Sequence, residues 1–178
     1  MPRLKEVEPD EATGHVKQIF DAAEEEFGSV PNLFKGLGAS PVGLRAYTQL
    51  GKIIDTGELS DLEQSVVRLV ASQYNSCEYC VGAHTMECQQ NGLTEEETLQ
   101  IRRGESEDER LAALGAFTVR VLETRGFVED ADLADFREEG YEDAQVVEVL
   151  TIIAQKTLSN YFNHVHQTEL DFPAAPEL

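Results

Sequence analysis

Residues 74–84 of the chain read Tyr74-Asn75-Ser76-Cys77-Glu78-Tyr79-Cys80-Val81-Gly82-Ala83-His84. On an α-helix, the spacing of Cys77, Cys80 and His84 points the three side chains to one side, where they can share a pocket. Two thiols at this spacing favour dithiol redox chemistry, because one thiolate attacks an oxidant or a disulfide and the other closes an internal disulfide. A nearby imidazole can move the proton. These three residues are the candidate catalytic site.

The flanking sequence predicts that the cysteines lie at the start of a helix. Ser60 and Glu63 have the spacing of a capping box for a helix that ends near Tyr74. Asn75 or Ser76 can then cap the next helix. Thiols in the first turns of a helix meet unpaired N–H groups and the positive dipole end, which lower a thiol pKa from ~8.5 towards ~3.5 to 7.5.

Ordinary explanations exist for each of these residues taken alone. Free cysteine often packs as a small buried hydrophobe, and a lone histidine on an apolar face is usually a satisfied core residue. Cys88, which has no partner in the sequence, fits this packing role. For Cys77, Cys80 and His84 the joint spacing favours chemistry instead.

Zinc is the main alternative ligand, since Cys77, Cys80, His84 and Cys88 form a Cys3His set. These four residues would span about 16 Å along one helix face and could not converge on one metal. A site with three of these ligands and a fourth from His164 or His166 stays open. We expect no metal and no cofactor.

Composition limits the possible partners and the compartment. The 178 residues suit a single domain spanning residues 1–178, and 34 acidic against 14 basic residues give a net charge of −20. This charge argues against nucleic acid and against anionic membrane surfaces as partners. The start of the chain has no hydrophobic signal region, so we expect a soluble cytoplasmic protein. Structural disulfides are rare in that compartment, which favours a catalytic or redox-sensing cysteine pair.

Helical periodicity covers most of the chain and strand alternation is almost absent, which predicts an all-α fold. Residues 29–41 form a turn-rich passage, and residues 171–178 form a proline-rich tail that should run extended. The expected helices are 16–27, 41–54, 60–74, the cysteine helix ending at Asn91-Gly92, a short one capped by Thr94 and Glu97, 107–125, 130–139 and 143–165. On the last helix the expected inward residues are Val146, Val149, Leu150, Ile153, Thr157 and Tyr161.

The segment from Leu59-Ser60 through the cysteines to His84 resembles the signature of the AhpD-like, carboxymuconolactone decarboxylase-type family of alkylhydroperoxidases. The stretches Glu11–Gly14, Gly28–Phe34 and Asp171–Pro173 resemble its peroxidase-related branch. The resemblance implies an AhpD-like helical bundle and a homo-oligomer, either a trimer or a hexamer.

The same resemblance implies a thiol peroxidase cycle with antioxidant function. Cys80 would attack a small hydroperoxide and become a sulfenic acid, and Cys77 would condense with it to form the redox-active disulfide. His84 would transfer the proton to and from Cys80, and an external dithiol reductant would regenerate the pair. Decarboxylases of the superfamily generally lack the C-x-x-C pair.

One position departs from the family pattern. A glutamate usually lies twelve residues before the first cysteine, at the far end of the proton relay, and Ser65 occupies that position here. Glu63 lies ~200° round the same helix and cannot substitute for it. Glu87, one turn after His84, could orient the imidazole, but we interpret it as an exposed carboxylate. The alternatives to a peroxidase are a dithiol redox sensor or carrier-interacting protein, a carboxymuconolactone decarboxylase-like enzyme, and a non-redox scaffold.

Overall fold

Helix α4 (Asp61–Tyr74) is the central helix of the structure, a computed structural model that describes residues 1–178. It packs against α5, α6, α7 and α9, and most of its residues are buried. The other helices are α1 (Gly14–Phe27), α2 (Asn32–Leu37), α3 (Pro41–Ile54), α5 (Glu78–Gln90), α6 (Glu95–Arg103), α7 (Glu109–Thr124), α8 (Asp130–Glu138) and α9 (Asp143–His166). The chain has no strand, so the predicted all-α fold is confirmed.

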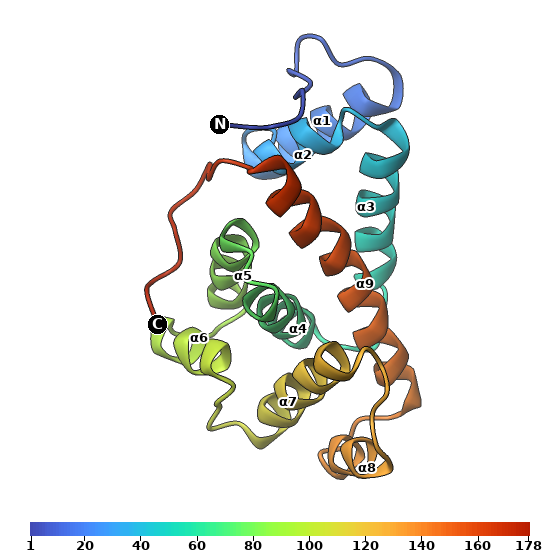
Figure 1. Ribbon diagram of the computed structural model, residues 1–178, viewed down its shortest axis with the longest axis vertical. Helices are drawn as coiled ribbons and strands as arrows, with labels where there is room; N and C mark the ends of the chain where they lie inside the picture. The colour runs from blue at the N-terminus through green and yellow to red at the C-terminus, as the bar shows by residue number, and fades with distance from the viewer.

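Helix α9 runs along most of the length of the molecule (Figure 1). It packs against α3 and α4 and also contacts α2, α5 and α7. Helices α1 and α2 lie at one end of the molecule and α8 lies at the other (Figure 1). The last residues, which form no helix, run past α5 and end beside α6. Helix α9 thus brings side chains from the C-terminal part of the chain to the cysteine helix α5.

The predicted capping boxes are present at the starts of α4 and α6. Ser60 Oγ accepts a hydrogen bond from the Glu63 N–H at 3.3 Å, and Glu63 Oε2 accepts one from the Ser60 N–H at 2.8 Å. Thr94 and Glu97 make the same reciprocal pair. These bonds satisfy backbone donors that would otherwise lack a partner in the first helical turn.

Two local expectations were wrong. The turn-rich passage 29–41 contains the short helix α2, whose N-cap is Pro31. On α9, Leu150 and Tyr161 are 43% and 56% exposed, although their apolar periodicity predicted an inward face. The buried face carries Val149 and Ile152, followed mainly by polar residues: Gln155, Lys156, Ser159, Asn160 and Asn163. Those side chains find partners inside the protein, so polarity does not mark the surface of this helix.

The apolar core has two parts. The larger cluster joins α4, α7, α8 and α9 and includes Val66, Leu114, Phe136 and Ile152. The smaller cluster joins α1, α2 and α3 to the start of α5, and both cysteines of the pair, Cys77 and Cys80, belong to it. The candidate site therefore lies at the boundary between the α1–α3 unit and the central helices.

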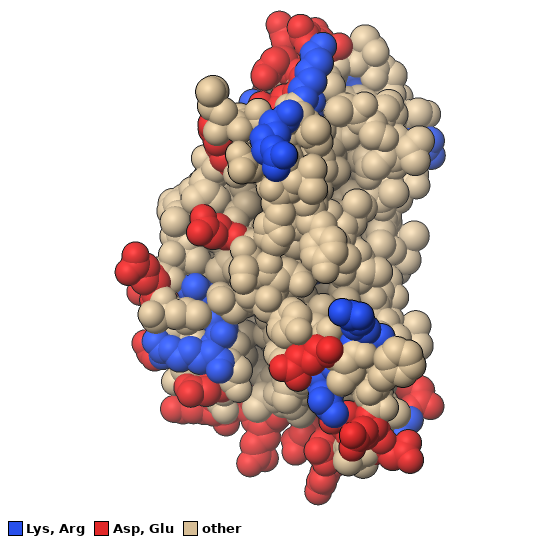
Figure 2. Space-filling view, viewed as in Figure 1, with Lys and Arg blue, Asp and Glu red and all other residues tan.

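An apolar surface without charged side chains runs along α9. We call Val147, Leu150, Leu158, Tyr161 and Val165, all substantially exposed, the α9 stripe. The two residues of this part of α9 that carry a carboxylate or an ammonium group point elsewhere: Glu148 accepts from the backbone N–H groups of Glu58 and Leu59, and Lys156 is buried. Acidic side chains gather instead at both ends of the molecule, most densely at the α7–α8 end, and the middle of the same view carries few charges (Figure 2). None of the helices has both the length and the hydropathy needed to span a bilayer.

Candidate functional site

A tight turn between α4 and α5 places the cysteine pair. Asn75 ends α4, and Ser76 adopts a left-handed conformation with φ 57°, so that the Cys77 N–H donates to the Ser72 carbonyl at 3.0 Å. Cys77 itself is the N-cap of α5, a position that we expected Asn75 or Ser76 to fill. Its Sγ accepts a hydrogen bond from the Cys80 backbone N–H at 3.4 Å. The cysteines lie at the start of a helix, as predicted.

The structure brings the two thiols together in a buried position. The Cys77 and Cys80 side chains approach to 3.0 Å and do not form a disulfide. The residues are 1% and 2% exposed, respectively. At this separation the pair can exchange a hydrogen bond when reduced and needs little movement to close a disulfide.

Asn163 of α9 holds the thiols from the opposite side. Its Nδ2 donates to Cys80 Sγ at 3.1 Å and lies 3.6 Å from Cys77 Sγ. Its Oδ1 accepts a hydrogen bond from Thr168 Oγ1 at 2.6 Å, which fixes the orientation of the amide. Because the oxygen is committed to Thr168, the two N–H donors face the sulfurs.

The surroundings make the two thiols unequal. The pKa of Cys80 falls to about 6, because the Cys77 thiol donates to it, Lys156 supplies positive charge, and Asn160 and Asn163 donate hydrogen bonds; burial opposes this shift. The pKa of Cys77 rises far above its ordinary value, first because its thiol is the hydrogen-bond donor to Cys80 and then because it is buried. Near neutral pH the pair therefore consists of a Cys80 thiolate and a Cys77 thiol.

Lys156 is a site residue that the sequence analysis missed. It is 2% exposed, and its Nζ lies 3.0 Å from His84 Nε2 and 3.4 Å from the Tyr47 hydroxyl. The sequence did hold a signal: Lys156 follows Val149 and Ile152 on one face of a largely apolar helix. A lysine at such a position must find a partner if the face is buried.

His84 contacts Lys156 and Glu87, and no hydrogen bond links it to either cysteine. Its Nδ1 lies 2.6 Å from Glu87 Oε2. Burial, and then the charge of Lys156, lower the pKa of His84 to about 4, although Glu87 opposes the shift. The imidazole is therefore neutral at pH 7, with Nδ1–H donating to Glu87 and Nε2 accepting from Lys156. Its predicted part in proton transfer stays a prediction.

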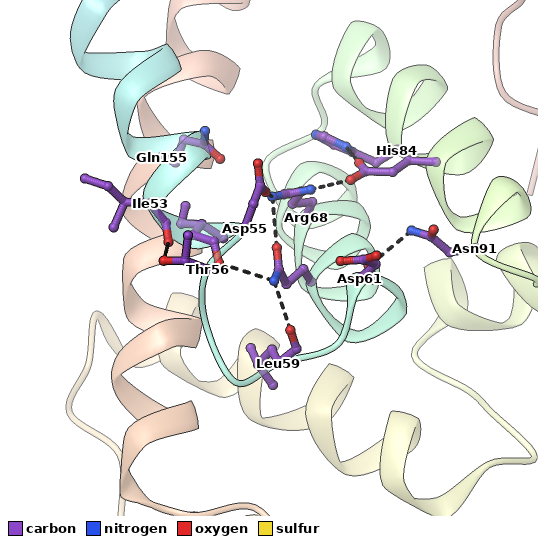
Figure 3. Close-up of polar contacts among 12 residues, drawn as sticks. Ile53, Asp55, Thr56, Leu59, Asp61, Arg68, His84, Asn91 and Gln155 are labelled. Carbon is purple, nitrogen blue, oxygen red and sulfur yellow. Dashed lines mark hydrogen bonds and ion pairs between the residues drawn. The ribbon is translucent and has the colours of Figure 1, made fainter.

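Glu87 is not the exposed carboxylate that we expected. Its side chain is 28% exposed and pairs with His84 and with Arg68 of α4. Arg68 in turn pairs with Asp55 at 3.0 Å, so the chain of contacts runs from His84 through Glu87 and Arg68 to Asp55 (Figure 3). Burial would raise the pKa of Glu87, but the His84 hydrogen bond and the charges of His84, Arg68 and Lys156 lower it to about 2.

Ser65, at the position of the usual family glutamate, takes no part in this network. It is fully buried, and its hydroxyl donates to the Leu62 carbonyl at 2.8 Å. The carboxylate that faces the imidazole comes instead from α5 itself, three residues after His84. Glu63 caps α4 and pairs with Arg110 at 2.8 Å, well away from the histidine network.

The remaining cysteine and histidines lie apart from the thiol pair. Cys88 is fully buried in the larger core cluster, which agrees with a packing role, and burial raises its pKa to about 12. His164 is exposed on α9, and His166 contacts Glu6 and the Leu4 N–H. No three His, Cys, Asp or Glu side chains converge in the way that a metal ion needs.

The C-terminal segment covers the start of α5. The Phe172 ring packs on Tyr79 with 4.7 Å between ring centroids, and Asp171 Oδ2 accepts a hydrogen bond from the Asn32 N–H at 2.6 Å. Gly82 makes this approach possible, because a Cβ at that position would lie 2.8 Å from Phe172. The segment therefore joins α2 to the cysteine helix and contributes to the burial of the thiols.

The arrangement of helices and the position of the cysteine pair define the chain as an AhpD-like helical protein with a C-x-x-C helix. An uncharacterized peroxidase-related protein from Ralstonia eutropha JMP134 with the alkylhydroperoxidase AhpD core has this fold: the TM-score is 0.88 at 23% identity, over 96% of this chain and 92% of that chain. A second peroxidase-related protein, from Silicibacter sp. TM1040, gives a TM-score of 0.80 at 20% identity, over 94% of this chain and 93% of that chain.

Residues 41–112 match the model of the carboxymuconolactone decarboxylase family. A third similar structure is the debrominase Bmp8 in complex with 2,3,4-tribromopyrrole, with a TM-score of 0.79 at 15% identity, over 96% of this chain and 92% of that chain. No curated protein matches the sequence. Proteins of this fold thus include a debrominase as well as peroxidase-related proteins, so the fold alone does not define the activity of this chain.

Proposed function

We propose that the protein is a dithiol-dependent reductase of small hydroperoxides. The observation that carries this proposal is the asymmetry of the buried pair: Cys80 is hydrogen-bonded and favoured as thiolate, and Cys77 beside it is favoured as thiol. A thiolate is the nucleophile that a peroxide requires, and a neighbouring thiol is the group that resolves its product. The match of residues 41–112 to the carboxymuconolactone decarboxylase family and the likeness to peroxidase-related proteins support an antioxidant role.

The proposed cycle has three steps: attack on the peroxide, formation of the disulfide and its reduction. The Cys80 thiolate attacks one oxygen of the hydroperoxide, so that an S–O bond forms, the O–O bond breaks and an alkoxide leaves, which takes up a proton. Cys80 is now a sulfenic acid. The Cys77 thiol loses its proton and attacks the Cys80 sulfur, which forms the disulfide and releases water. An external dithiol then reduces the disulfide and is itself oxidised to a disulfide.

Lys156 and His84 are proposed to serve the proton transfers of this cycle. The Lys156 ammonium stabilises the thiolate and is the charged donor closest to His84, 3.0 Å from its Nε2. His84, held by Glu87, is neutral and can accept a proton from Lys156. No hydrogen bond joins either His84 or Lys156 to the Cys80 thiol, so in this proposal the proton transfers need a small movement that brings one of them within reach of the sulfur.

Burial of the thiols supports a second candidate function. Cys77 and Cys80 are 1% and 2% exposed, which restricts access to their sulfurs. A dithiol redox sensor or carrier-interacting protein does not need rapid turnover, so restricted access to its sulfurs is compatible with its function. In that case the pair would exchange with cellular thiols and turn over peroxide slowly.

We also propose that the chain forms a homo-oligomer in the cytoplasm, with the α9 stripe in the interface. An exposed apolar helix face without charged side chains is unusual in a chain with a net charge of −20. Association of copies would remove this face from water. A cytoplasmic location would keep the pair reduced and supply an external dithiol reductant.

Steady-state assays decide between the two functions. Reduced protein is mixed with hydrogen peroxide, tert-butyl hydroperoxide or cumene hydroperoxide, with dithiothreitol as the reductant, and peroxide loss is followed. A peroxidase consumes many equivalents of peroxide per chain, and Cys80→Ser abolishes this consumption. Consumption of no more than one equivalent, together with disulfide exchange against oxidised glutathione, would support the sensor or carrier instead.

A further inference from the structure

A cavity separate from the thiols lies between α1, α3 and α9. Its volume is about 460 Å³, which is in the range of small-molecule binding sites. Its apolar lining includes Ile19 and the aromatic rings of Phe27, Phe34 and Tyr47. Neither cysteine of the pair lines it. The cavity can therefore hold an apolar or aromatic group without involving the dithiol.

Gln155 supplies an unused hydrogen-bond acceptor at this cavity. Its side chain reaches from α9 towards α3 (Figure 3), and its Nε2 donates to the Tyr47 carbonyl at 3.2 Å. The residue is 4% exposed, and its Oε1 is buried without any partner. If the amide were flipped, Oε1 would face the Tyr47 carbonyl, which is also an acceptor. A flip therefore does not give Oε1 a hydrogen-bond donor. A ligand that donates a hydrogen bond would satisfy it.

Gly51 makes room for this amide beside the cavity. A Cβ at position 51 would lie 2.9 Å from Gln155 Nε2, closer than two such atoms tolerate. Gly51 and Gln155 both line the cavity. The missing side chain at position 51 therefore lets the Gln155 amide pack closely against α3 at the edge of the cavity.

Two cations and two carboxylates line the cavity. Arg45 and Lys52 line it, are exposed, and take part in no ion pair of the structure. Glu26 and Asp55 also line the cavity, but Asp55 is committed to Arg68 at 3.0 Å. Arg45 and Lys52 thus outnumber the one carboxylate without an ion-pair partner, Glu26, and this local excess of positive charge favours an anionic ligand.

We propose that this cavity binds a small amphipathic carboxylate with a hydrogen-bond donor at its far end, such as a phenolic acid. The donor reaches Gln155 Oε1, the ring packs on Phe27, Phe34 and Tyr47, and the carboxylate lies at Arg45 and Lys52. Because the Tyr47 hydroxyl lies 3.4 Å from Lys156 Nζ, the ligand contacts a residue that borders the thiol cluster. The proposal does not depend on peroxide turnover, and binding is its readout.

Isothermal titration calorimetry with 3-(4-hydroxyphenyl)propionate tests the proposal. We expect a dissociation constant below about 1 mM, which corresponds to about 4 kcal/mol. 3-Phenylpropionate, which lacks the donor, should bind about fivefold more weakly, the effect of one hydrogen bond. Tyramine, which carries an ammonium group in place of the carboxylate, should not bind. Absence of binding by the phenolic acid, or equal binding of all three compounds, would overturn the proposal.

Variants locate the site. Gln155→Leu removes the acceptor with little change in size, and Arg45→Ala removes one rim cation; each should weaken binding of the phenolic acid about fivefold or more. Lys5→Ala removes an exposed cation that does not line the cavity and should leave binding unchanged. Arg45→Ala lies on the surface and should fold normally, so the test remains decisive if Gln155→Leu is unstable. Binding that survives both cavity variants would place the ligand elsewhere and refute the assignment.

Discussion

Asn163 Nδ2 lies 3.1 Å from Cys80 Sγ, and this contact joins the last helix to the cysteine helix across the site. Thr168 fixes the amide by donating to its Oδ1 at 2.6 Å. A hydrogen bond to a charged group is worth about 1.5 to 3 kcal/mol, or roughly one to two pKa units. Asn163 therefore contributes to the low pKa of Cys80, alongside the larger effects of the Cys77 thiol and the Lys156 charge.

Replacing Asn163 should raise the pKa of Cys80. In Asn163→Leu the thiolate loses a donor, so we expect the pKa to rise from about 6 by about one unit or more. Thr168→Val, which frees the amide to rotate, should give a smaller rise. Ultraviolet absorbance of the thiolate as a function of pH measures both. Asn91→Leu is the matched control, since its amide donates to the Asp61 carbonyl far from the thiols. An unchanged midpoint in Asn163→Leu would rule out this role.

Lys156→Met tests the buried cation. Loss of a positive charge disfavours the thiolate, so the pKa of Cys80 should rise, and the rate of alkylation at pH 6 to 7 should fall by about tenfold for each unit. Methionine keeps the length and the apolar stem of lysine, which limits damage to packing. Lys52→Met, an exposed lysine, is the control. Equal alkylation profiles for Lys156→Met and the parent protein would show that Lys156 does not activate the thiol.

The two cysteines should have distinct roles. Cys80→Ser should abolish peroxide consumption, and Cys77→Ser should leave one sulfenic acid at Cys80 that dimedone traps, because no thiol remains nearby to resolve it. Mass spectrometry of the trapped adduct locates the oxidised residue. Trapping mainly on Cys77 in the parent protein would reverse the roles, and oxidation of neither cysteine would favour the non-redox scaffold.

Stability should fall in mild acid because of His84. Its pKa is about 4 in the folded protein and about 6.5 in the unfolded chain, so the unfolded state binds more protons below pH 6.5. The contribution of neutral His84 to the free energy of unfolding is therefore fully present above pH 6.5 and is lost as the pH falls towards 4. Between pH 7 and 5 the free energy of unfolding should fall by about 2 kcal/mol. Glu87, with its pKa lowered to about 2, adds a loss between about pH 4.5 and 2.

Chemical denaturation at pH 7 and pH 5 measures this loss. His84→Gln cannot titrate but can still donate to Glu87, so its stability should change less between the two pH values than that of the parent protein. The difference between the two proteins separates the His84 contribution from the changing repulsion among surface carboxylates, which both share. If the free energy of unfolding fell by the same amount in both proteins between pH 7 and pH 5, His84 would be excluded as the cause of the acid sensitivity.

Charge introduced on the α9 stripe should prevent assembly. Tyr161→Glu or Val165→Glu places a carboxylate in the proposed interface, where burial without a partner is costly. Light scattering should then report a monomer, whereas the parent protein should be a trimer or a hexamer. Phe127→Glu is the matched control, because Phe127 is 85% exposed and lies outside the stripe. A monomeric parent protein at micromolar concentration would contradict the proposal.

The sequence by itself determined the helices other than α2 and the location of the thiol pair. Ser60 with Glu63 and Thr94 with Glu97 act within single turns, so their capping boxes follow from local spacing. The position of Cys77 and Cys80 at the start of a helix has the same local origin. Backbone hydrogen bonds and dipoles at a helix end act over a few residues, so they can be predicted from the local sequence alone.

Only the tertiary structure decided which side chains surround the thiols. Lys156 and Asn163 lie about eighty residues after the cysteines in the chain and reach them because α9 packs against α4 and α5. The contact between His84 and Glu87 is local to α5, but Arg68, the other partner of Glu87, comes from α4. On α9, apolar periodicity placed Val149 inward correctly but also placed the exposed Leu150 and Tyr161 there, because polar side chains with partners are buried instead. Which side chains are buried depends on contacts between segments far apart in the chain, and local periodicity cannot predict those contacts.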